Sequence, residues 1–579
     1  MNAKKSIKNS LKLLKKIINS NKHTKKVAVS AKRILIRAIG TNEPRELYNL
    51  QSFYPTIHDY YVQGKDYNSK TDPLISILLP TYNTPEEYLR ECIESIVIQS
   101  YKNWELCIAD DKSTDQNVVK VINEYVKSDK RIKLVVRKEN GHISEATNSA
   151  FKIASGDYIA LMDHDDVLWP NALYEMVKVI RSNKKVDFIY SDEDKIDGTG
   201  KLHSYPFLKP DFSPEFLESC NYITHFSCIR SSIMTKVSGF RKGYEGAQDW
   251  DLFLRISEIT SNIIHIPKLL YSWRIHEAST ASNTDAKPYV YEAQRKLLVD
   301  HIERIGMKGT VETGIITQHR TIKYEIEKNN KLSVVVFVSD LQKTKRLIES
   351  LNTYTPGVNY SLFYCSKFNI SKDEKAEITE IVGKSINQRF VKITELNKYP
   401  KVLEVVSANN ILYIEDSVSV MTENWAKIFL SETQRVGVGI VGPVLLDTSK
   451  DNIISAGLGL GYGNNGMADM LSGMPFDDPH YTRGLYAKSR RNVSAVNPAV
   501  FAVNLETIKP FIDSESDFNL INVCVKMLKK GYRHVYTPYV QFICYDNVVV
   551  DGGKYIYNKE DKYLNPNFNH MNGRMEVKA

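Results

Sequence analysis

Between residues 73 and 165, the hydrophobic positions form short apolar runs that alternate with stretches of helical periodicity. The runs have the length and composition of buried strands, and polar or turn residues follow each of them. They cover residues 74–79, 104–109, 132–136 and 158–162. Apolar residues three and four positions apart indicate helices between the runs, for example near residues 118–126. This alternation predicts a parallel sheet with helices on both of its faces.

The segment after the first run indicates how the following helix begins. Thr84 is a residue type that caps helix N-termini, Pro85 suits the first helical position, and Glu87 follows Thr84 by three residues. This spacing is that of a capping box, in which two side chains bind the backbone N–H groups at the start of the helix. We therefore predict a helix that is capped by Thr84.

Polar side chains directly follow three of the four apolar runs. In open sheets of parallel strands, ligands bind beyond the carboxyl ends of the strands, so these side chains should meet in one crevice. They are Thr81, Tyr82 and Asn83 after the first run, Asp110 and Asp111 after the second, and Asp163, His164, Asp165 and Asp166 after the fourth.

The acidic group after the fourth run is a candidate metal site. Asp163 and Asp165 lie two residues apart, so an extended backbone directs both to one side, whereas Asp166 points away unless the chain turns. Clustered carboxylates favour a hard cation, Mg²⁺ or Mn²⁺, that also holds a diphosphate. The alternative is a solvated acidic turn that caps the next helix. The polar ends of the neighbouring runs favour the metal site.

The net charge of +9 is concentrated at the N-terminus. Residues 1–40 contain ten lysines, two arginines and no acidic residue, which leaves −3 for the rest of the chain. Within an arm over residues 1–45, four apolar residues between Ile7 and Ile18 fall at helical spacing and lysines occupy the other face. Such a basic amphipathic helix predicts contact with an anionic membrane surface, but a basic tail or a helix packed on a protein would show the same pattern. The acidic remainder argues against a nucleic-acid groove.

The cysteines and the hydropathy indicate the cellular compartment in which the protein is expected. Seven cysteines are scattered inside apolar runs without a Cys-x-x-Cys pair, which indicates reduced, buried thiols in a cytosolic protein. We find no signal peptide and no apolar stretch of about 18 residues, the length of a membrane span. Residues 46–72 show no clear period and are predicted to be a lead-in. We therefore expect a cytoplasmic protein that is peripheral on the inner face of the cell membrane.

Five motifs between residues 73 and 325 carry a resemblance to a known family. They are ILLPTYN at 77–83, IADDKSTD at 108–115, LMDHDD at 161–166, GAQDWDL at 246–252 and WRIHEAST at 273–280. In this order they resemble the inverting glycosyltransferases of family 2, which have the GT-A fold. The sequence YSDEDK at 190–195 is similar to the branch that builds O-antigens, capsules and cell-wall rhamnans.

The resemblance implies a nucleotide sugar donor whose diphosphate is held by Mn²⁺ or Mg²⁺. The implied metal ligands are Asp163, Asp165 and His276, although a loop histidine packed on Trp273 would explain His276 equally well. Asp249 corresponds to the catalytic base, which takes the proton of the attacking hydroxyl. The implied nucleotide-sugar-binding residues are Thr81, Tyr82, Asn83, Asp110, Asp111, Asp163 and Gln248.

Gln248 and Asp251 lie on either side of the implied base. Gln248 stands where many family members have Glu, which leaves the role of Asp249 unchanged. Asp251 lies two positions after Asp249, and we expect it to begin a helix over residues 252–256 as a cap or scaffold residue.

The resemblance also bears on the substrates. Processive synthases of the family carry a Gln-x-x-Arg-Trp motif and several membrane spans, and this sequence has neither, so we expect transfer of one sugar or a short extension. dTDP-rhamnose is the first expectation for the donor, with UDP-hexose or UDP-N-acetylhexosamine as alternatives. The expected acceptor is a lipid-linked saccharide in bacterial surface polysaccharide synthesis. Oligomerisation with further copies of the chain is left open, and no nucleic acid is expected.

The second half repeats the pattern of the first half. A strand run restarts at residues 332–338, and the order of elements over residues 329–550 resembles that of the catalytic domain at 73–328. The acidic residues are thinned to Glu415-Asp416-Ser417, and Leu520 and Asn522 stand where the base is expected. We therefore predict a second, degenerate GT-A-like domain without catalysis, followed by a tail at 551–579. The predicted fold class is α/β, with two mixed sheets preceded by the basic helix.

Two other classes of function share features with this sequence. A nucleotidyltransferase would share the acidic metal site, but it needs a phosphate loop rich in glycine and basic residues after the first strand. Pro80-Thr81-Tyr82-Asn83 is not such a loop. A non-catalytic scaffold that binds sugar nucleotides is the second alternative.

Overall fold

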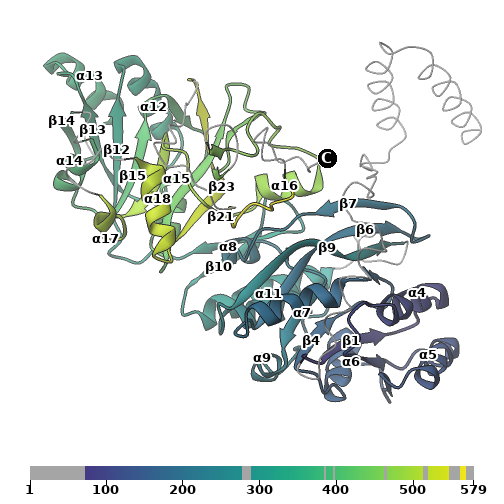
Figure 1. Ribbon diagram of the computed structural model, residues 1–579. Helices are drawn as coiled ribbons and strands as arrows, with labels where there is room; N and C mark the ends of the chain where they lie inside the picture. Colours follow the sequence, from purple (N-terminus) through teal and green to yellow (C-terminus); the bar gives the residue numbers. More distant parts are fainter. Residues whose placement is uncertain are drawn as a thin grey trace, which may run out of the picture.

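A computed structural model describes residues 72–276, 288–383, 386–394, 398–461, 466–512, 519–546 and 561–568. The chain forms two lobes, each built around one mixed sheet (Figure 1). The predicted basic arm at 1–45, nearly all of the lead-in and most of the tail lie outside the described residues. Within the described ranges, no helix is both long enough and apolar enough to cross a membrane.

The first sheet has nine strands in the order β3-β2-β1-β4-β8-β6-β9-β5, with β7 paired to β6. The four predicted apolar runs form its parallel half, as β1 (Ile75–Thr81), β2 (Trp104–Asp110), β3 (Ile132–Val136) and β4 (Tyr158–Leu161). The other half includes antiparallel pairs, so the sheet is mixed, as the fold class predicted. Its strands are β5 (Val167–Leu168), β6 (Phe188–Asp197), β7 (His203–Phe207), β8 (Ser227–Arg230) and β9 (Ile263–Ile275).

Side-chain alternation along the central strands separates the core into two layers. Ile77 of β1 packs in one buried cluster, whereas its neighbour Leu78 packs in the other, because successive side chains point to opposite faces of a sheet. One layer is covered by α4 (Glu86–Val97), α5 (Gln116–Ser128) and α7 (Ala172–Ser182). The other is covered by α6 (His142–Lys152), α10 (Gln248–Ser257) and α11 (Pro288–Arg304).

The predicted capping box at the start of α4 is wrong. The helix begins at Glu86, and Pro85 takes the N-cap position without any side-chain hydrogen bond. Pro85 has ψ 133°, which is not helical, and a residue before proline such as Thr84 is itself disfavoured in helical conformation. The Thr84 hydroxyl is buried without a hydrogen-bond partner. Glu86 and Glu87 occupy the first turn instead, where negative charge favours the helix dipole.

The second lobe repeats the topology of the first. Its sheet has the order β14-β13-β12-β15-β22-β17-β23-β16, in which every strand has a counterpart at the same place in the first sheet. The predicted second sheet is thereby confirmed. Its strands include β12 (Leu332–Val338), β13 (Tyr360–Ser366), β14 (Gln388–Lys392), β15 (Asn410–Glu415), β16 (Val418–Val420), β17 (Val438–Leu446), β22 (Val500–Asn504) and β23 (Arg533–Cys544).

The helices of the second lobe follow the same scheme. Helices follow β12, β13, β14 and β16 along the chain, and their apolar residues lie in the buried clusters of the lobe (Figure 1). The helices of this lobe include α12 (Leu341–Thr353), α13 (Lys372–Val382), α14 (Lys398–Val405), α15 (Trp425–Thr433) and α18 (Leu520–Lys529).

The two lobes share one core. Near α8 (Pro214–Leu217) of the first lobe lie α16 (Tyr481–Lys488) and β21 (Arg491–Val493) of the second (Figure 1). Phe216 meets Tyr486 edge to face at 5.5 Å, within a single buried cluster that extends through both lobes. The lobes are therefore packed together as parts of one hydrophobic core.

Buried charges cross the same junction. The Glu218 carboxylate accepts hydrogen bonds from Arg435 at 2.8 Å, from Arg490 at 2.6 Å and from the Tyr324 hydroxyl at 2.7 Å. Glu432 binds both arginines from the other side, at 3.0 and 2.7 Å. Burial raises the pKa of Glu218, but the two guanidinium groups outweigh burial and hold it far below its ordinary range. The carboxylate is therefore ionised at neutral pH.

Replacement of Glu218 by alanine should destabilise the protein strongly. Removal of one partner from a buried ion pair leaves an uncompensated charge and costs about 3–5 kcal/mol. Urea unfolding followed by tryptophan fluorescence measures the change. Glu404→Ala, which breaks a surface ion pair with Lys401, is the control and should leave the unfolding midpoint in place. Equal midpoints for both variants would contradict a role for Glu218 at the junction.

Candidate functional site

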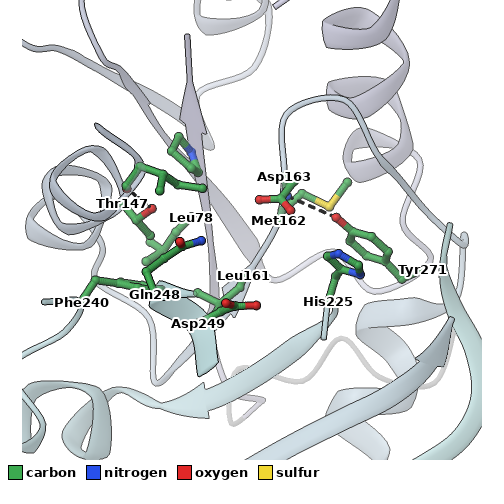
Figure 2. Close-up of a pocket in the computed structure, with 12 residues that line it drawn as sticks. Leu78, Thr147, Leu161, Met162, Asp163, His225, Phe240, Gln248, Asp249 and Tyr271 are labelled. Atoms are coloured by element: carbon green, nitrogen blue, oxygen red, sulfur yellow. Dashed lines mark hydrogen bonds between the residues drawn. The ribbon is translucent and has the colours of Figure 1, made fainter. Parts of the chain in front are cut away.

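A cavity lies at the carboxyl ends of β1 and β4. Figure 2 shows Asp163 and Asp249 on its wall, with Gln248 beside Asp249. These three predicted residues come from the end of β4 and the start of α10, more than 80 residues apart in the sequence. The full lining is Leu78, Pro80, Ile143, Thr147, Leu161, Met162, Asp163, His225, Phe240, Gln248, Asp249 and Tyr271.

The turn after β4 is fixed by the strand β9. Asp166 is fully buried, and its carboxylate accepts hydrogen bonds from the Tyr271 hydroxyl and from the backbone N–H of Arg274 at 2.7 Å. The Arg274 guanidinium donates to the Asp165 carbonyl oxygen at 2.6 Å. The backbone N–H of Asp163 donates to the Tyr271 hydroxyl at 3.3 Å. The chain therefore turns at this point, and Asp166 is directed toward β9.

Two of the three predicted metal ligands are in direct contact. The Nε2 of His276 lies 2.8 Å from Asp165 Oδ2. Burial raises the pKa of Asp165, but His164 and His276 outweigh burial and hold it below its ordinary value. Burial is the main cause that raises the pKa of Asp163.

The donor set fits a divalent cation in chemistry but is incomplete in number. Carboxylate oxygens and an imidazole nitrogen suit Mn²⁺, and Mg²⁺ takes carboxylates together with substrate phosphates. Among the described residues, no group of three or more His, Cys, Asp or Glu side chains is placed to hold a metal ion. A cation here would therefore draw further ligands from a bound diphosphate.

The alternative interpretation of His276, as a loop residue packed on Trp273, stays a prediction. The His276 ring packs on Tyr88 of α4, at 5.2 Å between ring centroids. Trp273 packs on the His225 ring, at 4.7 Å between ring centroids. His276 directly follows β9 and lies beside Asp165, and its metal role stays a prediction.

The predicted base lies in the first turn of α10. Asp249 is half-buried, and its carboxylate accepts hydrogen bonds from Asn221 at 2.8 Å and from the backbone N–H of Trp250 at 2.9 Å. Burial is the largest influence on the Asp249 pKa and raises it, while the His225 charge and both hydrogen bonds lower it. A raised pKa brings a carboxylate closer to the pH at which it works as a base.

The glycine before this helix is required by geometry. Gly246 has φ +82°, and a Cβ atom at this position would lie 2.7 Å from Val290 Cγ2. Its N–H donates to the Gln248 side chain at 2.7 Å, which holds Gln248 at the cavity wall.

Asp251 is a scaffold residue, as predicted, but it does not begin the helix. The helix starts three residues earlier, at Gln248. Asp251 is fully buried and accepts hydrogen bonds from Arg241 at 3.1 Å and from Arg255 at 2.9 Å. A carboxylate held by two guanidinium groups is not available as a base.

The remaining predicted residues gather beside the cavity at the ends of β1 and β2. Asp110 accepts hydrogen bonds from Ser113 and from Thr81, and Asp111 binds Arg137 at 2.8 Å. Asn83 accepts from the backbone N–H groups of Thr114 and Asp115 at 2.8 and 3.1 Å. Tyr82, of which 44% is accessible, and Asn83 are the exposed members. The structure thus brings the predicted residues at the ends of β1 and β2 together. Their carboxylates and the Asn83 side chain are bound by hydrogen bonds from neighbouring protein groups.

Three residues that the sequence did not single out also belong to the site. His225 and Tyr271 line the cavity, and Asn221 orients Asp249. His225 and Asn221 precede β8, a strand of four residues that pairs with β4 on one side and β6 on the other. The polar residues that flank the apolar run at 226–229 could have predicted this part of the site, but only once the run is known to pair with β4.

Equivalent strand registers identify the counterparts of these residues in the second lobe. Since β1 pairs with β4 as β12 pairs with β15, Glu415 takes the place of Asp163 and Ser417 that of Asp165. The helix positions correct the predicted counterparts of Asp249, which were Leu520 and Asn522: Asp249 is the second residue of α10, and Ile521 is the second residue of α18. Asp416 is used structurally, because it accepts hydrogen bonds from Ser339, Asp340 and Thr344.

Comparison with known proteins adds the family. Residues 76–241 match the family model described as glycosyl transferase family 2, which ends just before the helix that carries Asp249. An uncharacterized protein, y4gI of Sinorhizobium fredii, is 35% identical over 483 residues, covering 81% of this chain and 52% of that protein. The O-antigen biosynthesis protein RfbC of Myxococcus xanthus is 31% identical over 381 residues, covering 65% of this chain and 29% of that protein. The chain thus spans about half or less of the length of these two relatives.

A shorter relative is covered more completely. The uncharacterized glycosyltransferase MJ1057 of Methanocaldococcus jannaschii is 32% identical over 212 residues, which make up 35% of this chain and 71% of that protein. Residues 76–241, which match the family model, include Asp163, a residue of the acidic turn that lines the cavity. Family model, relative and site geometry agree, and the chain belongs to glycosyl transferase family 2.

Proposed function

We propose that the first lobe is an inverting glycosyltransferase that moves one sugar from a nucleotide sugar to a hydroxyl of a saccharide acceptor. The acceptor oxygen attacks the anomeric carbon opposite the leaving group, so one carbon–oxygen bond forms while the bond to the diphosphate breaks. Asp249 takes the hydroxyl proton. The observation that carries this proposal is that Asp163, Gln248 and Asp249 line the same cavity.

A divalent cation is part of the proposal. Asp165 and His276, with Asp163 beside them, would hold Mn²⁺ or Mg²⁺. When bound, such an ion offsets the negative charge that develops on the leaving diphosphate. The chain itself contributes the turn that Asp166, Tyr271 and Arg274 hold against β9.

We propose dTDP-rhamnose as the donor, with UDP-hexose and UDP-N-acetylhexosamine as alternatives, and a lipid-linked saccharide as the acceptor. A relative named for O-antigen biosynthesis supports a role in bacterial surface polysaccharide synthesis. In this proposal the basic arm, which lies outside the described residues, holds the enzyme to the inner face of the cell membrane. The test is a screen of these donors with Mn²⁺, in which release of nucleoside diphosphate that depends on an added saccharide supports transfer. A chain that turns over no nucleotide sugar would be a scaffold.

Replacement of Asp249 by asparagine should lower turnover while donor binding stays near that of the wild type. Loss of a general base costs about 10²–10⁴-fold in rate, and the amide keeps the size of the side chain. Steady-state kinetics and calorimetric titration of the donor measure the two effects. Asp251→Asn is the comparison, because loss of its pairs with Arg241 and Arg255 should lower stability instead. Turnover near wild type in folded Asp249→Asn would place the base elsewhere.

The pH profile gives a further test of the same base. Only the ionised carboxylate accepts a proton, so activity should rise with pH through an inflection above about 3.9, the ordinary aspartate pKa. The hydrogen bond from Asn221 lowers the pKa of Asp249, so Asn221→Leu should move the inflection to higher pH. An inflection that stays in place in this variant would contradict the assignment.

Removal of the cation should stop the reaction. Excess EDTA should abolish transfer, and Asp165→Asn should weaken donor binding measured in Mn²⁺, because a neutral amide is a poorer ligand than a carboxylate. Asp115→Asn is a matched control at a neighbouring strand end. Asp115 caps α5, and asparagine caps equally well, so this variant should bind the donor normally. Full activity in EDTA would remove the cation from the proposal.

The second lobe should be silent in catalysis. Glu415→Gln should leave the transfer rate unchanged, because the counterparts of Asp165 and Asp249 are Ser417 and Ile521, which can neither bind a metal as carboxylates nor take a proton. Asp416→Asn should lower the melting temperature instead, since it disturbs a buried acceptor of several hydrogen bonds. Loss of transfer in a folded Glu415→Gln protein would indicate a second working site.

A further inference from the structure

His225 lies opposite Asp163 because of the strand register. In the antiparallel pair of β4 and β8, Tyr158 faces Arg230 and Ala160 faces Cys228. The same register, continued beyond both strands, sets Asp163 against His225. Both residues line the cavity, and Figure 2 shows the His225 imidazole between Tyr271 and Asp249.

A buried ion pair holds the imidazole from behind. The Nδ1 of His225 lies 3.1 Å from Glu193 Oε2, and the same oxygen accepts a hydrogen bond from Lys209 at 2.9 Å. Lys209 is fully buried, and it also donates to the carbonyl oxygens of Ile223, at 3.1 Å, and of Thr224. Lys209 therefore fixes both the carboxylate that binds the ring and the segment that carries it.

Glu193 determines which ring nitrogen remains for a ligand. Burial raises the pKa of Glu193, but Lys209 and His225 outweigh burial and lower it to about 2, so this group is a carboxylate at neutral pH. A carboxylate only accepts, so Nδ1 of His225 is its donor. The ring stacks on Tyr271, with 5.4 Å between centroids and 5° between planes. Nδ1 thus binds Glu193 and the ring packs on Tyr271 and Trp273, which leaves Nε2 for a ligand.

The imidazole also carries a charge. Burial lowers the pKa of His225, but Glu193 outweighs burial, and the carboxylates of Asp166 and Asp163 add to its effect, raising it to about 9. Among the described residues that line the cavity, there is no lysine or arginine, and His225 is the cation. An anionic ligand in this cavity has this one protein charge to bind.

We infer that His225 binds the diphosphate of the sugar nucleotide through Nε2 and stabilises the nucleoside diphosphate as it leaves. This role rests on the proposed function and adds a protein cation to the carboxylates that line the cavity. Glu193 and Lys209 orient the ring, and Asp163 lies across from it. The contact is made to phosphate oxygens, so it distinguishes a nucleotide from its nucleoside.

The test compares a nucleoside diphosphate with the nucleoside alone. Calorimetric titrations use UDP and uridine, and dTDP and thymidine, with Mn²⁺ and with EDTA. His225→Gln should lower the affinity for the diphosphates about 10- to 100-fold, as expected for loss of a charge-assisted hydrogen bond, and leave the nucleosides unchanged. His203→Gln is the matched control, because its Nδ1 binds the buried Asp194 at 2.8 Å but the residue lies outside the cavity lining.

Each outcome decides one question. A wild-type protein that binds no nucleoside diphosphate refutes the proposed function itself. If the wild type binds but His225→Gln loses nothing, or loses nucleoside and diphosphate equally, the role of His225 is refuted. A second measurement uses only the wild type and so does not depend on the folding of a variant. It follows hydrogen exchange at the C2 atom of each histidine imidazole. UDP should slow this exchange at His225 and uridine should not, and equal effects of both would overturn the inference.

Discussion

The site depends on one buried carboxylate, that of Asp166, which ties the end of β4 to β9. Burial and the charges of Asp165 and Asp163 raise its pKa well above the ordinary range, so the fold holds this group at an energetic cost. Hydrogen bonds from the Tyr271 hydroxyl and the Arg274 backbone offset that cost. These hydrogen bonds hold the turn after β4 against β9. Since β9 also ends beside His276, one strand sets the acidic turn and the imidazole in register.

The two lobes show which parts of this architecture serve the fold and which serve chemistry. Both sheets keep the same strand order, and both use an aspartate after the fourth strand, Asp166 or Asp416, to bind neighbouring elements. By the same register, Ala499 stands at the place of His225, and its carbonyl oxygen accepts from the Glu415 backbone at 2.8 Å. The second lobe thus has an alanine in place of the cavity cation, and its buried aspartate stands at the register position of His164. Its contribution lies in the shared core and in the arginines that bind Glu218.

Local signals in the sequence predicted much of this arrangement. The apolar runs placed β1 to β4 within a residue or two, and the resemblance placed Asp249 and Gln248, which do line one cavity with Asp163. Where prediction failed, a nonlocal effect was responsible. Thr84 has the right type for a cap, but Pro85 keeps an extended conformation and removes the helix start from its reach. The sequence did not predict His225 as a site residue, because its position depends on a short antiparallel strand between β4 and β6. No local pattern shows this pairing.

The charge balance of the cavity explains why an imidazolium belongs there. Asp163, Asp165, Asp166 and Asp249 lie close enough for their charges to act on one another, and like charges at short range oppose ionisation. His225 is the largest charge that lowers the pKa of Asp163 and also that of Asp249. A neutral side chain at this position would leave both carboxylates harder to ionise, which would weaken the base and the cation ligand together. Glu193 and Lys209 keep the imidazole charged and in place, so the acidic wall remains usable before any substrate arrives.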